Sequence, residues 1–363
     1  MAPTNTSNNL TPSSKKGPPE TLWDWPIEEQ KAWWENHFDE PAFRLKQVQQ
    51  WVYGQQVVEA EKMGNLPANL REKMTKACPP LLEFDTCLKA KDQSADKYLF
   101  RCHDDSRLES VMLRSGSRRT ICLSTQVGCA LACTFCHTGL AGFKRNLSVG
   151  EMVEQVLRIS HLEEERISNL VIMGMGEPMQ NYDALMVALR QINSEKGLNI
   201  GARHITISTS GVRGGIRKLA NEPEQWGLAV SLHAPNDQLR SELMPINRSV
   251  CLKELMEEID EYISKTNRRV SFEYIMLGGT NSSENHAKEL VSLLKGKLCH
   301  VNLIPYNPVP TLPFSATENQ AIDNFEAIVN QGGIPCTTRR ERGQDILAAC
   351  GQLAHRKVEE KRA

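Results

Sequence analysis

Residues 120–136 read TICLSTQVGCALACTFC, a short apolar run followed by Cys129, Cys133 and Cys136 in the spacing C-x3-C-x2-C. The run 120–125 predicts a β-strand, because it is short, apolar and rich in β-branched residues. Three thiols this close in sequence must meet at one place in the fold. The loop after this strand is therefore the first candidate site.

Beyond this strand, short apolar runs alternate with longer amphipathic stretches. The runs that predict strands are 169–174, 204–209, 227–232, 270–277, 300–305 and 334–339. The stretches that predict helices are 148–160, 183–192, 251–263 and 284–296. This alternation predicts an α/β fold with a parallel sheet and right-handed crossovers. About six repeats fit either an open doubly wound sheet or a barrel that does not close.

The composition divides the chain into parts. The start is polar and predicts a disordered leader, and the next part is rich in Trp and predicts a small helical module. In that module FRLKQVQQWVY (43–53) places Phe43, Val48, Trp51 and Val52 on one helical face. The expected parts are a leader at 1–20, a helical accessory and RNA-binding domain at 21–100, a catalytic domain at 101–350 and a tail at 351–363.

The charge and the cysteine content limit the classes of function that the chain can have. The chain has 363 residues, 43 Lys or Arg and 44 Asp or Glu, so its net charge of −1 supplies no overall attraction to nucleic acid. It contains no apolar run long enough to span a membrane and no secretory signal, so we expect a cytoplasmic protein without membrane contact. Eleven cysteines in such a protein favour metal or thiol chemistry over disulfides.

Three interpretations of the cysteine triplet remain open on the residues alone. The thiols could simply be buried, or they could bind zinc with the adjacent His137 as fourth ligand. They could also hold a [4Fe–4S] cluster through three of its irons, which leaves the fourth iron open to a chelating small molecule.

The longer string CLSTQVGCALACTFCHTGLAGFKRNL (122–147) resembles the radical S-adenosylmethionine (SAM) superfamily. Within it, the string is similar to the RNA adenine carbon-2 methyltransferases of the RlmN/Cfr type. The similarity continues through 43–53, 171–185, 205–212, 231–237, 302–308 and 342–353, and only His137 departs from the small residue expected after the third cysteine. The resemblance implies a partial, open (β/α)6-type radical SAM barrel with a small N-terminal helical accessory domain.

The resemblance also implies the cofactors and their residues. Cys129, Cys133 and Cys136 would hold the [4Fe–4S] cluster. Glycines after the second strand would let the backbone approach a ligand, and a carboxylate beside them would accept hydrogen bonds from the amino group of SAM. The implied SAM-binding residues are Gly176, Glu177, Ser208, Ser231, Leu232, His233 and Asn307.

Three further residues would carry the chemistry, by the same resemblance. Cys350 would carry a methyl group as S-methylcysteine, Cys122 would be its partner thiol, and Glu109 would accept a proton. One SAM would methylate Cys350, and a second would supply a radical that makes the methyl group add to carbon 2 of an adenine. Cys122 would then release the product by forming a transient disulfide with Cys350. The other six cysteines, at 78, 87, 102, 251, 299 and 336, are expected in the core.

The implied substrate is an adenine of 23S rRNA, with tRNA near the anticodon as a second substrate. Two alternatives remain: methylation at carbon 8, and a zinc-dependent RNA-binding module without catalysis. We expect a monomer that receives electrons from a donor such as flavodoxin or ferredoxin. The expected local RNA contacts are Arg114, Arg118, Arg119, Lys144, Arg145, Arg339, Arg340 and Arg342.

Overall fold

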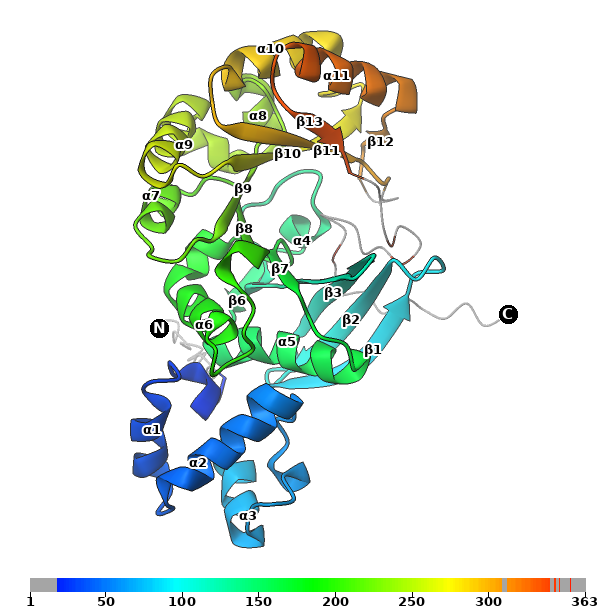
Figure 1. The fold of residues 1–363 in the computed structure, drawn as a ribbon. Helices are drawn as coiled ribbons and strands as arrows, with labels where there is room; N and C mark the ends of the chain where they lie inside the picture. The colour runs from blue at the N-terminus through cyan, green and yellow to red at the C-terminus, as the bar shows by residue number, and fades with distance from the viewer. Residues whose placement is uncertain (1–17, 309–311, 340–342, 344–345, 347–352, 354–363) are drawn as a thin grey trace, which may run out of the picture.

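The structure, a computed structural model, describes residues 18–308, 312–339, 343, 346 and 353. Its centre is one large sheet in which the strands follow the order β1-β2-β3-β4-β7-β8-β9-β10-β11-β13 (Figure 1). The strands are β1 (Leu82–Lys89), β2 (Ala95–Cys102), β3 (Arg107–Ser115), β4 (Arg118–Cys122), β7 (Asn169–Ile172), β8 (Ile205–Thr209), β9 (Gly227–Ser231), β10 (Val270–Gly278), β11 (Cys299–Pro305) and β13 (Cys336–Thr338). The short β12 (Ser315–Ala316) pairs with β10, and β5 (Gln126–Gly128) pairs with β6 (Phe143–Asn146) in a separate small sheet.

The sheet is mixed. Strands β1 to β4 are antiparallel neighbours, and from β4 to β13 every neighbouring pair in this order is parallel. In the described part of the chain β1 and β13 lie at opposite ends of the sheet and do not pair with each other, so the sheet is not closed into a barrel. This confirms the predicted open α/β fold.

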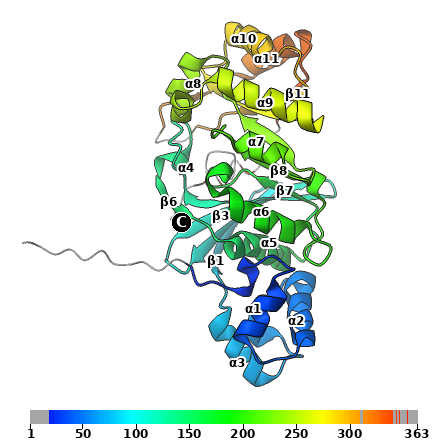
Figure 2. The same cartoon turned by 90° about the vertical axis from the view of Figure 1, so that its left-hand side faces the viewer.

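Helices connect the parallel strands on the outer side of the sheet, while the segment after β4 lies on the inner side (Figures 1 and 2). Each helix begins where the amphipathic pattern of the sequence begins. Helix α5, for example, starts with a capping box formed by Ser148 and Glu151. The helices of this layer are α5 (Val149–Glu163), α6 (Tyr182–Asn193), α7 (Gly215–Ala220), α8 (Asp237–Leu243), α9 (Leu252–Thr266), α10 (Glu284–Leu294) and α11 (Asn319–Gln331). Short 3-10 turns lie at Pro178–Asn181, Ala202–His204 and Pro245–Arg248.

The N-terminal module is helical, but over a shorter range than predicted. It contains α1 (Gln30–His37), α2 (Ala42–Gln49), a π-helical turn Gln50–Gly54 and α3 (Ala68–Ala77), with 3-10 turns at Leu22–Asp24 and Ala60–Lys62. Helices over the whole of 21–100 are a wrong prediction, because β1 and most of β2 fall in that range and extend the central sheet. Phe43 is also not on the buried face: it is 52% exposed, whereas Val48 and Val52 are buried.

Buried polar contacts fasten this module to the helices of the sheet. The carboxylate of Asp24 accepts a hydrogen bond from the backbone N–H of Gly150 in α5 (2.8 Å). The side-chain amide of Gln191 in α6 donates to the carbonyl of Trp23 (2.9 Å) and accepts from the hydroxyl of Tyr53 (2.9 Å). The module and the sheet therefore share one continuous core.

Two sequence expectations can be compared directly with the described residues. None of the helices in the described part of the chain is long and apolar enough to cross a membrane. Of the six cysteines expected in the core, Cys78, Cys102, Cys299 and Cys336 are buried and Cys87 is half-buried. Cys251 is exposed, because it is the residue directly before α9, at the surface end of that helix.

Candidate active site

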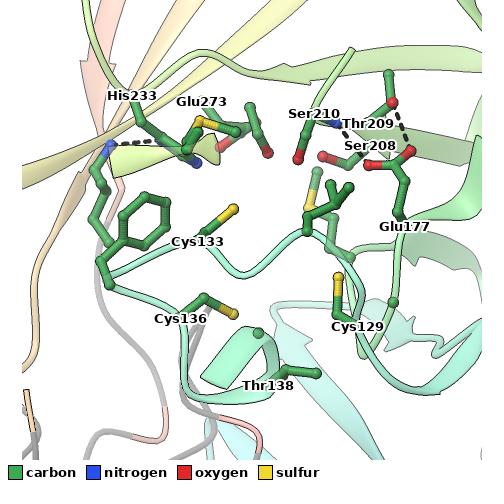
Figure 3. Close-up of a pocket in the computed structure, with 18 of the residues that line it drawn as sticks. Cys129, Cys133, Cys136, Thr138, Glu177, Ser208, Thr209, Ser210, His233 and Glu273 are labelled. Atoms are coloured by element: carbon green, nitrogen blue, oxygen red, sulfur yellow. Dashed lines mark hydrogen bonds between the residues drawn. The ribbon is translucent and has the colours of Figure 1, made fainter. Parts of the chain in front are cut away.

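A cavity of about 140 Å³ lies at the carboxyl ends of the parallel strands. Cys129, Cys133 and Cys136 line it on one side, and Figure 3 shows their sulfurs pointing into the same space. Residues after successive strands line the other side, since parallel strands end at the same edge of a sheet. They include Gly174, Gly176, Glu177, Ser208, Thr209, Ser210, Ser231, His233 and Glu273.

The loop that carries the cysteines is closed by the β5–β6 pair. The backbone N–H of Cys129 donates to the carbonyl of Gly142 (3.0 Å), and Thr134 donates to the carbonyl of Leu243 (2.9 Å). The short helix α4 (His137–Leu140) follows Cys136 directly. These contacts hold the loop against the sheet edge, so the sequence spacing alone does not determine where the thiols point.

The environment of the thiols suits an iron–sulfur cluster. Burial raises the pKa of Cys129 to about 11 and also raises the pKa of Cys133, and the neighbouring cysteines raise both further because thiolates repel one another. A cationic centre removes that cost, and thiolates are the ligands that iron–sulfur clusters use. His137, the fourth ligand that a zinc site would need, is not among the residues that line the cavity.

Glu177 is fully buried at the cavity and is held by its own chain. Its carboxylate accepts hydrogen bonds from the hydroxyl of Thr209 (2.6 Å), from the backbone N–H of Ser210 (2.9 Å) and from that of Met179 (3.1 Å). Burial raises its pKa, and these hydrogen bonds oppose that rise. The carboxylate is therefore fixed in place beside the thiols with most of its acceptor positions already used.

The glycines before Glu177 line the cavity and are also required by the packing of the chain itself. A Cβ at Gly174 would lie 2.5 Å from Oγ of Ser124, and one at Gly176, where φ is +103°, would lie 2.6 Å from Cβ of Gln126. Both glycines are thus required by the close approach of the β4–β5 segment. The sequence prediction explained them by close approach of a ligand.

His233 lines the cavity as a neutral imidazole. Burial lowers its pKa to about 3, and its Nδ1 accepts a hydrogen bond from the backbone N–H of Ile275 (3.1 Å). The proton of the neutral ring is therefore on Nε2, which makes His233 a hydrogen-bond donor at that atom. Ser208 and Ser231 also line the cavity; Leu232 is buried behind it, and Asn307, after β11, is not among the lining residues.

Sequence reasoning missed two charged residues of the site. Glu273, in the middle of β10, is 5% exposed and lines the cavity, where Asn302 donates to it (2.8 Å) and Arg339 forms an ion pair with it (3.4 Å). Arg240 is 1% exposed and donates to the carbonyls of Ser210, Leu232 and Ser231 at the strand ends. An acidic residue within the apolar run VSFEYIML was the available signal for Glu273.

The structure brings Cys122 and Glu109 together on one face of the sheet, although neither is among the residues that line the cavity. Cys122 in β4 pairs with Val111 in β3, and Glu109 is two residues from Val111 on the same strand, so all three side chains share a face. Cys350 lies outside the described residues. Leu353 is described: it lines the cavity, and its carbonyl accepts a hydrogen bond from the hydroxyl of Thr138 (2.6 Å).

Several of the basic residues expected to contact RNA form ion pairs within the chain. Arg114 pairs with Asp96 and Glu163, Arg119 pairs with Glu165, and Arg145 pairs with Asp104 and Glu151. Arg339 pairs with Glu273 inside the cavity, as described above. Lys144, 46% exposed, pairs with Asp104 (3.5 Å), and Arg118 is exposed and donates to Asn169. Arg340 and Arg342 lie outside the described residues.

An open parallel sheet with three loop cysteines over its carboxyl edge defines the class of radical SAM enzymes. The family profile of the Radical SAM superfamily matches residues 123–294, and members of that superfamily use a [4Fe–4S] cluster and SAM. The profile described as "Ribosomal RNA large subunit methyltransferase N-terminal domain" matches residues 22–79 and ends before β1.

Curated relatives narrow the class to one family. The chain is 46% identical to the probable dual-specificity RNA methyltransferase RlmN of Bacillus pumilus (strain SAFR-032), over 94% of this chain and 95% of that protein. It is 45% identical to the protein of the same name in Geobacillus thermodenitrificans (strain NG80-2), over 92% of each. A radical SAM methyltransferase from Sphaerobacter thermophilus has the same fold, with a TM-score of 0.89 and 44% identity over 92% of this chain and 99% of that one. The chain belongs to the RlmN family.

Proposed function

We propose that this protein is a radical SAM methyltransferase that methylates carbon 2 of an adenine in 23S rRNA and, near the anticodon, in tRNA. Family membership and the cavity support this proposal together. The observation that carries it is the position of three converging thiols opposite a buried carboxylate and a row of hydroxyl groups, in a chain so similar to the RlmN relatives.

Cys129, Cys133 and Cys136 would hold the cluster, and the opposite wall would hold SAM. Glu177 has acceptor capacity left for the amino group, and Nε2 of His233 supplies a donor for a carboxylate or ring nitrogen. Ser208 and Ser231 add hydroxyl groups at the ends of β8 and β9. The proposed SAM-binding set also includes Gly176, Leu232 and Asn307. Gly176 and Leu232 would contribute through the position of their backbone.

A cluster held by Cys129, Cys133 and Cys136 would supply, together with SAM, one-electron chemistry: a radical that activates the methyl group on Cys350 for addition to adenine carbon 2, and an acceptor for the electron that the resulting adduct gives up. Glu109 then accepts the proton of adenine carbon 2, which restores the aromatic ring. Sγ of Cys122 attacks Sγ of Cys350, so that the sulfur–sulfur bond forms as the sulfur–carbon bond breaks. The released carbon takes up a proton and becomes the methyl group.

We propose the division of the chain into domains on the same two grounds, family membership and the structure. Residues 22–79 would form the accessory RNA-binding domain, and the catalytic domain, expected over 101–350, would begin earlier, with β1 at Leu82. We further propose a cytoplasmic monomer that takes electrons from a flavodoxin or ferredoxin.

The test compares two cysteine variants after expression in cells. Cys122→Ala keeps the methyl carrier but lacks the thiol that breaks the sulfur–carbon bond, so RNA should stay covalently attached to Cys350 through denaturing electrophoresis. Cys350→Ala should carry no RNA. Absence of attached nucleotide from the Cys122 variant, beside an active wild-type preparation, would refute the covalent route.

Nucleoside analysis distinguishes the position of methylation. Mass spectrometry after chromatography of the rRNA and tRNA pools should show 2-methyladenosine, and 8-methyladenosine would instead identify the alternative specificity. Anaerobic purification should give a brown protein with about four irons per chain. A colourless zinc protein would exclude the proposed function.

A further inference from the structure

Lys97 lies beside the proposed proton acceptor. Its ammonium nitrogen is 3.7 Å from Oε1 of Glu109, and both side chains are almost completely buried, at 6% and 2% exposure. Lys97 in β2 pairs with Val111 in β3, and Val111 pairs with Cys122 in β4. Lys97 and Cys122 therefore lie in one transverse row of the sheet, and Glu109 occupies the next row on the same face.

The helix layer does not share this face. Ser110, whose side chain points the other way, donates to Gln155 of α5 (2.7 Å), so α5 covers the opposite side. A lysine at a buried sheet position is unusual, because removing an ammonium from water costs several kcal/mol unless it is paired. Burial lowers the pKa of Lys97 below its usual value, and the charge of Glu109 opposes part of that lowering.

A buried carboxylate without a cation takes up a proton near neutral pH and then cannot accept another. Lys97 cancels this effect, because an ammonium at this distance favours the ionised carboxylate. The pair as a whole is neutral and can stay buried while Glu109 keeps its capacity to accept a proton. No polar partner of this kind is needed for folding alone, since an apolar pair would fill the same space.

We propose that Lys97 is a positioning residue that keeps Glu109 ionised and oriented for removal of the carbon-2 proton; this inference rests on the proposed function. In the step concerned, the carbon–hydrogen bond at carbon 2 of the attached adenine breaks. Its electron pair stays with the ring as the aromatic system is restored, and its proton goes to the carboxylate of Glu109. Lys97 transfers nothing in this step and acts only through its charge.

Other titratable groups on this face, among the described residues, do not replace Lys97. Arg107, two residues before Glu109, forms its ion pair with Asp85 (3.7 Å), and Arg101, opposite Arg107, pairs with Glu83 and Asp105. Lys144 contacts Ser106 and Asp104 near the start of β3. Two further titratable groups from β4 lie on this face: Cys122, and Arg118 four residues before it, which donates to the side-chain oxygen of Asn169 (3.0 Å).

The test uses Lys97→Met, which keeps an unbranched side chain only one atom shorter and removes the charge. Purified enzyme is given SAM, reductant and an RNA substrate, and the covalent RNA adduct and the methylated product are followed in single-turnover reactions from pH 6 to 9. In the wild type the conversion of adduct to product should vary little with pH. In Lys97→Met it should be about 10- to 100-fold slower at pH 7 and recover as pH rises, because higher pH ionises Glu109.

Deuterium at carbon 2 of the target adenine gives a second reading. It should slow the conversion of adduct to product in Lys97→Met, since breaking this bond has become rate-limiting. An unchanged pH profile without an isotope effect would overturn the inference. If wild-type enzyme forms neither adduct nor product while the cluster and SAM are bound, the proposed function has failed instead.

Two more variants separate a positioning role from a structural one. Lys97→Arg keeps the positive charge and should keep the flat pH profile. In a Glu109→Gln background, Lys97→Met should cause no further loss, because Lys97 acts only through Glu109. This double variant removes both charges, so it also guards against a folding defect. A further loss in the double variant, at equal iron content, would overturn the inference.

Discussion

At the scale of single residues, hydrogen-bond capacity limits what Glu177 can do. An ionised carboxylate has about four acceptor positions. Thr209, Ser210 and Met179 occupy three of them. One direction is left for a ligand, and an ammonium group of SAM suits it because charged hydrogen bonds are the stronger ones.

Glu177→Gln should therefore weaken SAM binding at least about 10-fold, because the amide brings two donors to a place where the chain already supplies donors. Anaerobic calorimetry with SAM measures the effect. Thr209→Ser, which keeps the hydroxyl group, is the matched control and should bind SAM as the wild type does. Undiminished affinity in the Gln variant would mean that Glu177 only supports the loop.

At the scale of elements, the β5–β6 pair decides whether the cysteine loop can close. Gly128 and Gly142 both have positive φ, +77° and +78°. Their surroundings differ: a Cβ on Gly128 would lie 1.8 Å from the carbonyl oxygen of Gly142, whereas nothing lies within 4 Å of a Cβ on Gly142. The same carbonyl accepts the hydrogen bond from Cys129.

Gly128→Ala should consequently lose the cluster, and Gly142→Ala should keep most of it. Both changes share the backbone cost of about 1–2 kcal/mol for a side chain at positive φ, so the comparison isolates the steric effect on the loop. Iron per chain after anaerobic reconstitution is the measurement. Equal iron content in the two variants would show that the loop tolerates a displaced β5–β6 pair.

The elements that could be predicted from the sequence are those with a clear period. All seven predicted strands are present, and so are the four helices predicted between them, because apolar runs and amphipathic stretches alternate there. Strands β1 and β2 could not be separated from the helical module: in LEFDTCLK, Phe84 is 40% exposed, so the run has no clean alternation. The cluster cysteines were predicted from spacing, whereas the pairing of Lys97 with Glu109 depends on strand register, which no local pattern encodes.

At the scale of the whole molecule, charge is distributed unevenly along a nearly neutral chain. Residues 22–41 contain one Lys and six Asp or Glu, whereas 42–79 contain six Lys or Arg and three Glu. In the rest of the described chain, Arg114, Arg119 and Arg145 are engaged in ion pairs. The excess of basic residues thus falls on α2 and α3, at the end of the molecule opposite α10 and α11 (Figure 1).

Phe43 and Arg44, at the start of α2, combine exposed aromatic surface with charge. Phe43 is 52% exposed, and the guanidinium carbon of Arg44 lies 4.7 Å from the centre of its ring. Stacked pairs of this kind bind unpaired bases, and each base stacked on an aromatic side chain contributes about 1–3 kcal/mol. On the proposed function, this surface would hold RNA outside the cavity.

Replacing both residues, Phe43→Ala with Arg44→Ala, should weaken RNA binding about 10-fold and reduce its dependence on salt by roughly one phosphate contact. SAM binding and iron content should not change, because neither residue lines the cavity. Titration of labelled tRNA and rRNA fragments at several salt concentrations measures the effect. Lys288→Ala, on the exposed surface of α10, is the control for loss of a positive charge elsewhere. An unaltered RNA affinity in the double variant would place the RNA platform on another surface, with the helical module left as a support for α5 and α6.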